Sequence, residues 1–143
     1  MNKVKAADLK YGRTMEELAQ PVLEVIFGKL TNNNIRNIYH PIDFKNKSFG
    51  VEYKRRRIKF GKHPTAMLNI SKIIKGLEYK SKGKRVFYIW EYEDDTYCWE
   101  LDDTYTKGKG GTCRRGRDEI VDVAHIKNEY INKLSDLNIN ANL

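Results

Sequence analysis

The chain has 143 residues, of which 40% are hydrophobic and 11% aromatic, and its formal net charge is +8 at pH 7, with a sequence pI near 9.4. This length suits one hydrophobic core and is short for two, so the sequence predicts a single domain over residues 1–143. A basic chain attracts polyanions, which makes nucleic acid the leading partner. No apolar run approaches the roughly twenty residues of a spanning helix, so we expect no membrane association.

The N-terminal sequence MNKVKAADLK lacks the apolar stretch of a signal peptide. We therefore expect a soluble, intracellular protein, in the cytoplasm or nucleus of the host cell. Cys98 and Cys113 do not have a zinc-ligand spacing, and we expect two reduced thiols, one on a buried strand and one on a loop.

The first expected element is a helix from Thr14 to about Lys29, with a capping box at Thr14 and Glu17. Pro21 lies inside it, so one bent helix and two short helices are both open. Its apolar face would consist of Leu18, Val22, Val25 and Ile26.

A turn-rich break at residues 31–34 (TNNN) follows. Residues 35–44 and 49–60 are predicted to be the two strands of a hairpin, joined by a tight turn at residues 45–48 (KNKS). A second helix is predicted over residues 65–80, with one face formed by Met67, Ile70, Ile74 and Leu77.

Residues 85–92 and 97–101 are aromatic and β-branched, and they are predicted to be antiparallel strands. We expect their tryptophans and tyrosines to pack in the core rather than to stack on bases. Residues 104–118 mix glycine with cations and are predicted to be a mobile surface loop, followed by a final helix at about 122–136. The order of elements predicts an α/β fold with a central mixed β-sheet flanked by helices.

Asp43, Glu52 and Lys54 are the candidate catalytic residues. The short turn between Asp43 and Glu52 should bring two strand ends together, so that both carboxylates reach one ion. Glu52 and Lys54 share a strand face, while Tyr53 points the other way. Two carboxylates beside an ammonium suit phosphodiester cleavage. The alternative is a solvated hairpin in which Glu52 pairs with a neighbouring lysine across the strands.

Pro41-Ile42-Asp43 followed by Glu52-Tyr53-Lys54 resembles the PD-(D/E)XK nuclease superfamily, with Ile42 inserted between the proline and the aspartate. The resemblance implies a restriction-endonuclease-like core of a helix, three strands, a helix and a strand, here at about residues 12–101. It also implies Mg²⁺, with Mn²⁺ as a substitute, held by Asp43, Glu52 and the Tyr53 carbonyl, while Lys54 orients the attacking water.

The activity that the resemblance implies is a DNA endonuclease that leaves 5′-phosphate and 3′-hydroxyl ends, with structure-selective or sequence-specific cleavage. Residues 12–19 (GRTMEELA) are similar to the G-x-x-x-E-x-x-A opening of the first helix in Holliday-junction-resolvase-like members. By that similarity Glu16 is a further catalytic and metal-binding residue, with Glu17 and Glu24 as alternatives. Small nucleases of this type usually work as dimers, so we expect a homo-oligomer.

Two groups of cations are candidate contacts to the phosphates of duplex or branched DNA. Cations on the strand that leaves the site would contact phosphates on both sides of the cleavage point, although a charged edge strand is the alternative. Glycines beside the second group would let the backbone approach a phosphate, although such runs usually form a solubilising surface. The groups are Arg55, Arg56, Arg57, Lys59 and Lys62, and Lys107, Lys109, Arg114, Arg115 and Arg117.

His40 and His63 flank the predicted site, but isolated histidines are more often structural, and we assign them no role. Two other functions stay open. One is a non-catalytic nucleic-acid-binding module or accessory subunit with the same fold, and the other is an RNA-binding or RNA-cutting protein.

Overall fold

The structure of the protein is a computed structural model, and it describes residues 3–35, 40–112 and 119–139. The elements, with η for a 3₁₀ helix, are α1 (Lys3–Phe27), β1 (Thr31–Asn32), η1 (Asn33–Ile35), β2 (Phe44–Lys45), β3 (Phe49–Arg55), β4 (Thr65–Asn69), α2 (Ile70–Ser81), β5 (Arg85–Glu91), β6 (Thr96–Glu100), β7 (Thr106–Thr112), β8 (Glu119–Lys127), η3 (Asn128–Tyr130), β9 (Asn132–Lys133) and η4 (Leu134–Asp136).

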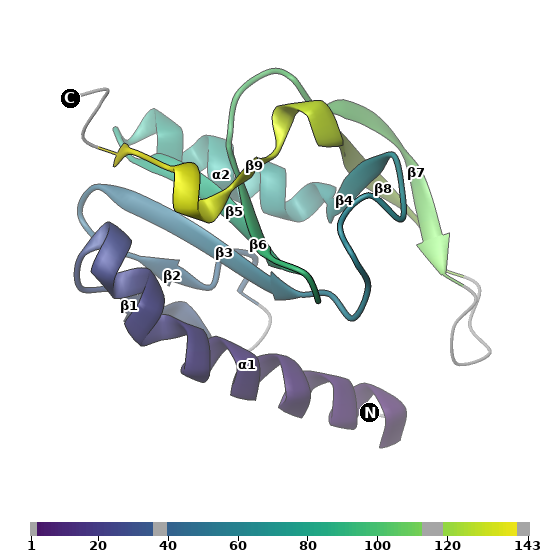
Figure 1. Cartoon of the computed structure of the whole chain (residues 1–143), viewed down its shortest axis with the longest axis horizontal. Coiled ribbons are helices and arrows are strands. Elements are labelled where there is room, and N and C mark those ends of the chain that lie inside the picture. Colours follow the sequence, from purple (N-terminus) through teal and green to yellow (C-terminus); the bar gives the residue numbers. More distant parts are fainter. Residues whose placement is uncertain (1–2, 36–39, 113–118, 140–143) are drawn as a thin grey trace.

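A mixed sheet of six strands, in the order β1-β2-β3-β5-β6-β9, lies between the two helices (Figure 1). A second sheet has three strands in the order β4-β8-β7. The predicted α/β class with a mixed sheet and flanking helices is confirmed. Among the residues that the structure describes, no helix combines the length and the apolarity needed to cross a membrane.

Strand β3 defines both faces of the main sheet, because its side chains alternate. Val51 and Tyr53 pack in one apolar cluster with Leu23 and Phe27 of α1. The other face packs against α2, and the ring of Tyr79 covers Gly50 so closely that an added Cβ would lie 2.5 Å from the ring. β3 pairs in parallel with β5, which requires a crossover connection, and α2 lies in that connection.

Helix α1 is longer than predicted, since it begins at Lys3 rather than Thr14. Thr14 is therefore not a cap, and its hydroxyl donates to the Lys10 carbonyl within the helix (2.9 Å). The helix is one element that continues through Pro21 and ends before Gly28, whose φ of +82° suits glycine.

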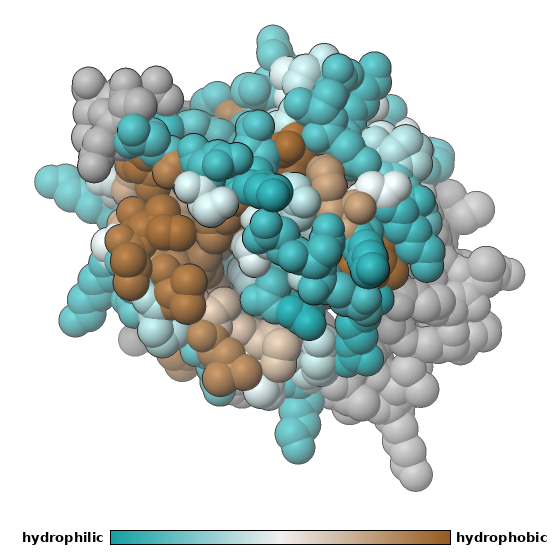
Figure 2. All heavy atoms as spheres, viewed as in Figure 1, coloured by the Kyte–Doolittle hydropathy of each residue, from teal (hydrophilic) through white to brown (hydrophobic). Residues whose placement is uncertain are grey.

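The predicted apolar face of α1 is also wrong in part, because Leu23 and Phe27 are the buried residues. Leu18, Val22 and Val25 are exposed. Figure 2 shows apolar side chains gathered on the side of the molecule where the C-terminal half of α1 lies.

The predicted helix over residues 65–80 is a strand followed by a helix. In β4, burial alternates so that Ala66 and Leu68 are inside, which is the strand period. The Asn69 side chain then caps α2 by accepting from the Ser71 N–H (3.1 Å). The buried face of α2 is Ile73, Gly76 and Tyr79, whereas the predicted Ile74 and Leu77 are 61% and 46% exposed.

The first strand of the predicted hairpin is also wrong. The predicted strand over residues 35–44 contributes only Phe44 to β2, with Ile35 in η1 and residues 36–39 outside the described part. The turn at 45–48 and the antiparallel pairing of β2 with β3 are as predicted.

The predicted loop at 104–118 is wrong for residues 106–112, and the predicted helix at 122–136 is wrong as well, since β7 and β8 form an antiparallel ribbon that is followed by η3, β9 and η4. Two of the glycines that suggested a loop have a packing role in the ribbon, because a Cβ on Gly110 would lie 2.5 Å from the Met67 sulfur and a Cβ on Gly108 would lie 3.1 Å from the His125 ring. Arg114, Arg115, Arg117 and Cys113 lie outside the described residues.

Gly76 yields a test of the packing between α2 and the sheet. A Cβ at this position would overlap with the Tyr88 hydroxyl oxygen and lie 2.8 Å from Leu101 Cδ2. Although alanine favours helix by about 1 kcal/mol over glycine, we expect Gly76→Ala to lower the free energy of unfolding by about 1–3 kcal/mol through overpacking. Urea unfolding measures this. Adding Tyr88→Phe should recover part of the lost stability, because it removes the hydroxyl that the new Cβ meets. A double variant whose loss equals the sum of the two single losses would show that this clash does not occur.

Candidate active site

Asp43, directly before β2, lies next to Glu52, which is in the middle of β3. The register pairs Phe44 with Val51, which places Asp43 beside Glu52. The backbone N–H of Tyr53 donates to Asp43 Oδ2 (2.8 Å). The two acidic residues are only 4% and 3% exposed. The predicted convergence of these carboxylates is therefore present, in a buried setting rather than on a solvated hairpin.

Glu52 is paired with Lys72, a residue of α2 that the sequence analysis missed. Lys72 Nζ contacts Glu52 Oε2 and also donates to the Pro41 carbonyl (3.3 Å). The other carboxylate oxygen, Glu52 Oε1, is buried, and no described residue forms a hydrogen bond with it. Burial and the nearby charge of Asp43 raise the pKa of Glu52 well above its usual range.

Asn34 joins Glu16 to Asp43. Its Nδ2 donates to Asp43 Oδ1 (2.6 Å) and to Glu16 Oε2 (3.1 Å). Burial, with the charge of Asp43, raises the pKa of Glu16 to about 8. Glu16 is thus linked to Asp43 through Asn34, whereas Glu24 accepts from the Leu30 N–H (2.8 Å) at the end of the helix.

Lys54 extends from the same face of β3 as Glu52, and Tyr53 points to the opposite face, as the strand period predicts. Although the Lys54 residue as a whole is exposed, desolvation of its ammonium and the charge of Lys72 lower the pKa of this group. Burial alone would also lower the pKa of Lys72, but the charges of Glu52 and Asp43 raise it. The site therefore contains two lysines in electrostatically different settings.

A cleft of about 210 Å³ opens beside these groups, and Glu52, Lys54, Arg56 and Lys72 line it together with Met67. The cations that were predicted to contact DNA beyond Lys54 do not all line this cleft. Arg55 forms an ion pair with Glu91, and the Arg57 guanidinium lies 3.8 Å from the centre of the Tyr11 ring. Lys59 and Lys62 are exposed in the segment that follows β3.

His40 lies beside the site but contacts the backbone, with Nδ1 2.7 Å from the Ile42 carbonyl oxygen. This contact fits a structural role. His63 is exposed, and its carbonyl accepts from Asn128 (2.7 Å).

The donor chemistry fits a hard divalent cation such as Mg²⁺, which binds through one or two carboxylates and retained waters. Asp43 and Glu52 supply two carboxylates, and the unpartnered Glu52 Oε1 leaves one oxygen for a ligand. Within the described part of the chain, no group of three or more His, Cys, Asp and Glu residues is arranged to hold a metal by itself. Oxygen atoms of the backbone, of water or of the substrate would therefore have to complete the coordination.

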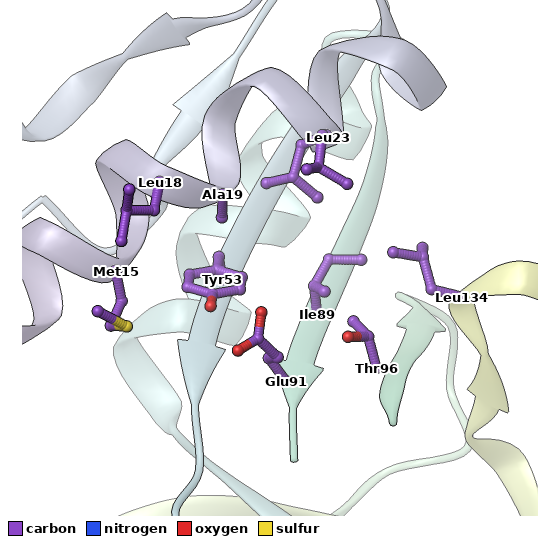
Figure 3. A pocket seen from close by; sticks show the side chains of 10 residues that line it. Met15, Leu18, Ala19, Leu23, Tyr53, Ile89, Glu91, Thr96 and Leu134 are labelled. Carbon is purple, nitrogen blue, oxygen red and sulfur yellow. The ribbon is translucent and has the colours of Figure 1, made fainter. Parts of the chain in front are cut away.

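A second cavity, of about 200 Å³, lies on the other face of the sheet, between α1 and strands β3, β5 and β6 (Figure 3). Met15 and Leu23 of α1 face Tyr53 and Ile89 across it, and Glu91 contributes a carboxylate. Neither Asp43 nor Glu52 lines this cavity. It is therefore separate from the carboxylate site.

Comparison with known proteins gives no match to this chain, either among family models or among curated proteins and solved structures. The function of this chain is therefore inferred from the geometry and chemistry of the site.

Glu16 gives the metal-free protein a testable pH dependence. Its pKa is raised on folding to about 8 from an ordinary value of 4.5, so the unfolded chain releases this proton at lower pH. This contribution to stability should be complete below about pH 4.5 and be lost as the pH rises towards 8. Chemical unfolding at several pH values in EDTA measures it. In Glu16→Gln, the free energy of unfolding should fall less steeply with rising pH than in the wild type. An unchanged pH dependence in that variant would show that Glu16 is not the group responsible.

Proposed function

We propose that this protein is a Mg²⁺-dependent DNA endonuclease of the PD-(D/E)XK superfamily with a restriction-endonuclease-like fold. One observation carries the proposal: the buried carboxylates of Asp43, directly before β2, and of Glu52, within β3, lie side by side, next to a cleft that Glu52 and Lys54 line. Burying two adjacent carboxylates costs free energy, and a structural role would not require it. Such an arrangement suits a site that binds a cation and acts on a phosphate.

The order of elements supports the same proposal. A helix precedes the β2–β3 hairpin, and α2 then connects β3 to the parallel strand β5. This order agrees with the core that the sequence resemblance implies, with the addition of the short strand β4 and the ribbon.

In the proposed reaction, Asp43 and Glu52 would hold Mg²⁺, with the Tyr53 carbonyl as a further ligand and Mn²⁺ as a substitute ion. The bound ion would polarise the scissile phosphate and lower the pKa of a water. Lys54, on the same face as Glu52, would orient the attacking water. Glu16 would support metal binding indirectly, either through Asn34, which links it to Asp43, or through a water on the metal. The products would carry 5′-phosphate and 3′-hydroxyl ends.

DNA, duplex or branched, is the proposed substrate. The net charge of +8 attracts a polyanion, and Lys54, Arg56 and Lys72 concentrate positive charge at the cleft. On the ribbon, Lys107 is exposed, whereas Lys109 forms an ion pair with Asp122. A homodimer is part of the proposal, because two active sites are needed to cut two strands together.

A non-catalytic nucleic-acid-binding protein with the same fold is the second candidate, and the ion pair between Lys72 and Glu52 favours it. The lysine already neutralises one of the two carboxylates, so the site can be stable without a metal ion. Metal-dependent cleavage separates the two candidates.

Cleavage of supercoiled plasmid, linear DNA and a synthetic four-way junction, each with Mg²⁺ or EDTA, tests the endonuclease. We expect Mg²⁺-dependent cutting that Asp43→Asn and Lys54→Ala reduce by at least about a hundredfold, the usual scale for groups that take part in proton transfer or charge stabilisation. Lys82→Ala is a matched control, because Lys82 is exposed and pairs with Glu78 on α2. Equal rates in folded Asp43→Asn and wild-type protein would exclude a catalytic site here.

Arg55 and Arg56 form a matched pair for DNA binding. Arg56 lines the cleft, whereas the charge of Arg55 is already paired with Glu91. We expect Arg56→Ala to weaken DNA binding and to reduce the slope of log affinity against log salt concentration by about one, which corresponds to the loss of one phosphate contact. Arg55→Ala should have a smaller effect on both. Fluorescence anisotropy with labelled duplex over a salt series measures both. Equal effects would show that the cleft is not the path of the DNA.

A further inference from the structure

Lys72, rather than the motif lysine, neutralises the buried acid of the site. The Lys72 ammonium contacts Glu52 Oε2, whereas Lys54 on the same strand as Glu52 forms no ion pair with any described residue. A buried carboxylate needs a compensating charge, and Lys72 supplies it in the protein without metal.

The position of Lys72 is fixed from several sides. Its backbone carbonyl accepts from the Tyr88 hydroxyl of β5 (2.7 Å), which holds the first turns of α2 on the sheet. Its Nζ also donates to the Pro41 carbonyl, two residues before Asp43. The ammonium is thus held between the two acidic segments, at the edge of the cleft that it lines with Lys54 and Arg56.

We propose that Lys72 is an internal counter-cation of Glu52 that a divalent metal ion must displace, and that the released ammonium then contacts the phosphate of the substrate in the same cleft. This inference rests on the proposed nuclease function, and it concerns how the site is loaded. A metal ion at Glu52 and the Lys72 ammonium would carry like charges at one carboxylate, so the two cannot both neutralise it at close range.

Removing the charge of Lys72 should have opposite effects on metal binding and on DNA binding. Without DNA, Lys72 competes with the metal, so removing its charge should strengthen metal binding. With metal and DNA present, Lys72 serves as a phosphate contact, so the same substitution should weaken DNA binding. A residue with only a structural role would change both affinities in one direction or leave them unaltered.

Calorimetric titration of the full chain with MnCl₂ in the absence of DNA is the first measurement. We expect Lys72→Met to bind Mn²⁺ roughly tenfold more tightly than the wild type, since close charge pairs in proteins interact by at least that much. Asp43→Asn, which should lose the binding, identifies the site. Lys75→Met is the matched control on the same helix, because Lys75 pairs with Glu78 instead.

The second measurement is DNA binding in Ca²⁺, a cation commonly used to support binding without cleavage. Here Lys72→Met should bind duplex more weakly than Lys75→Met, and Lys72→Arg should stay near the wild type in both experiments. If Lys72→Met does not fold, Lys72→Gln removes the charge while keeping a hydrogen-bond donor towards Glu52.

The outcomes separate this inference from the proposed function. Wild-type Mn²⁺ binding that depends on Asp43 but is no tighter in Lys72→Met or Lys72→Gln would overturn the inference and leave the nuclease proposal in place. Mn²⁺ binding that appears only after Lys72 is replaced would show that the ion does not displace Lys72 in the wild type, and it would overturn both the inference and metal loading of the wild type. A lack of binding in every variant would overturn both.

Discussion

The burial of Asp43 and Glu52 is the constraint around which the rest of the site is arranged. Two adjacent carboxylates away from water are unfavourable unless hydrogen bonds and opposite charge compensate them. The Tyr53 N–H, the Asn34 amide and the Lys72 ammonium supply that compensation. Each comes from a different part of the chain, so β3, the segment after β1 and helix α2 must all be in place for the site to exist.

The parallel pairing of β3 and β5 explains why α2 can meet this demand. A parallel pair needs a crossover, and the crossover helix packs on the sheet directly behind Glu52. Gly76 lets α2 approach Tyr88 closely, and the Tyr88 hydroxyl in turn holds the Lys72 carbonyl. Core packing on this face of the sheet and the electrostatics of the site therefore depend on the same few contacts.

The sequence predicted the parts of this arrangement that depend on strand period and short-range spacing. The strands around Glu52 and Trp90, the tight turn before Phe49 and the opposite directions of Glu52 and Tyr53 needed only local patterns. The ribbon of β7 and β8 was mistaken for a loop and a helix. From the sequence, a glycine such as Gly110, which leaves room for the Met67 side chain of β4, cannot be distinguished from a loop glycine. Lys72 and Asn34 were missed because their roles arise from tertiary contacts. Lys72 does share the i, i+4, i+7 face of α2 with Gly76 and Tyr79, and the correct helix face would have pointed to it.

The compensation of the acidic residues is incomplete in a way that bears on function. A carboxylate pair retained only for structure would have all its oxygens satisfied, since an unpartnered buried acceptor costs about 1–3 kcal/mol. Among the described residues, Glu52 Oε1 and Asn34 Oδ1 are both buried without a hydrogen-bond partner. The other polar atom of each side chain is already engaged, because Glu52 Oε2 contacts the Lys72 ammonium and Asn34 Nδ2 donates to Asp43. The nitrogen donors thus compensate the buried oxygen atoms only in part, and Glu52 Oε1 stays available to a cation that reaches the cleft.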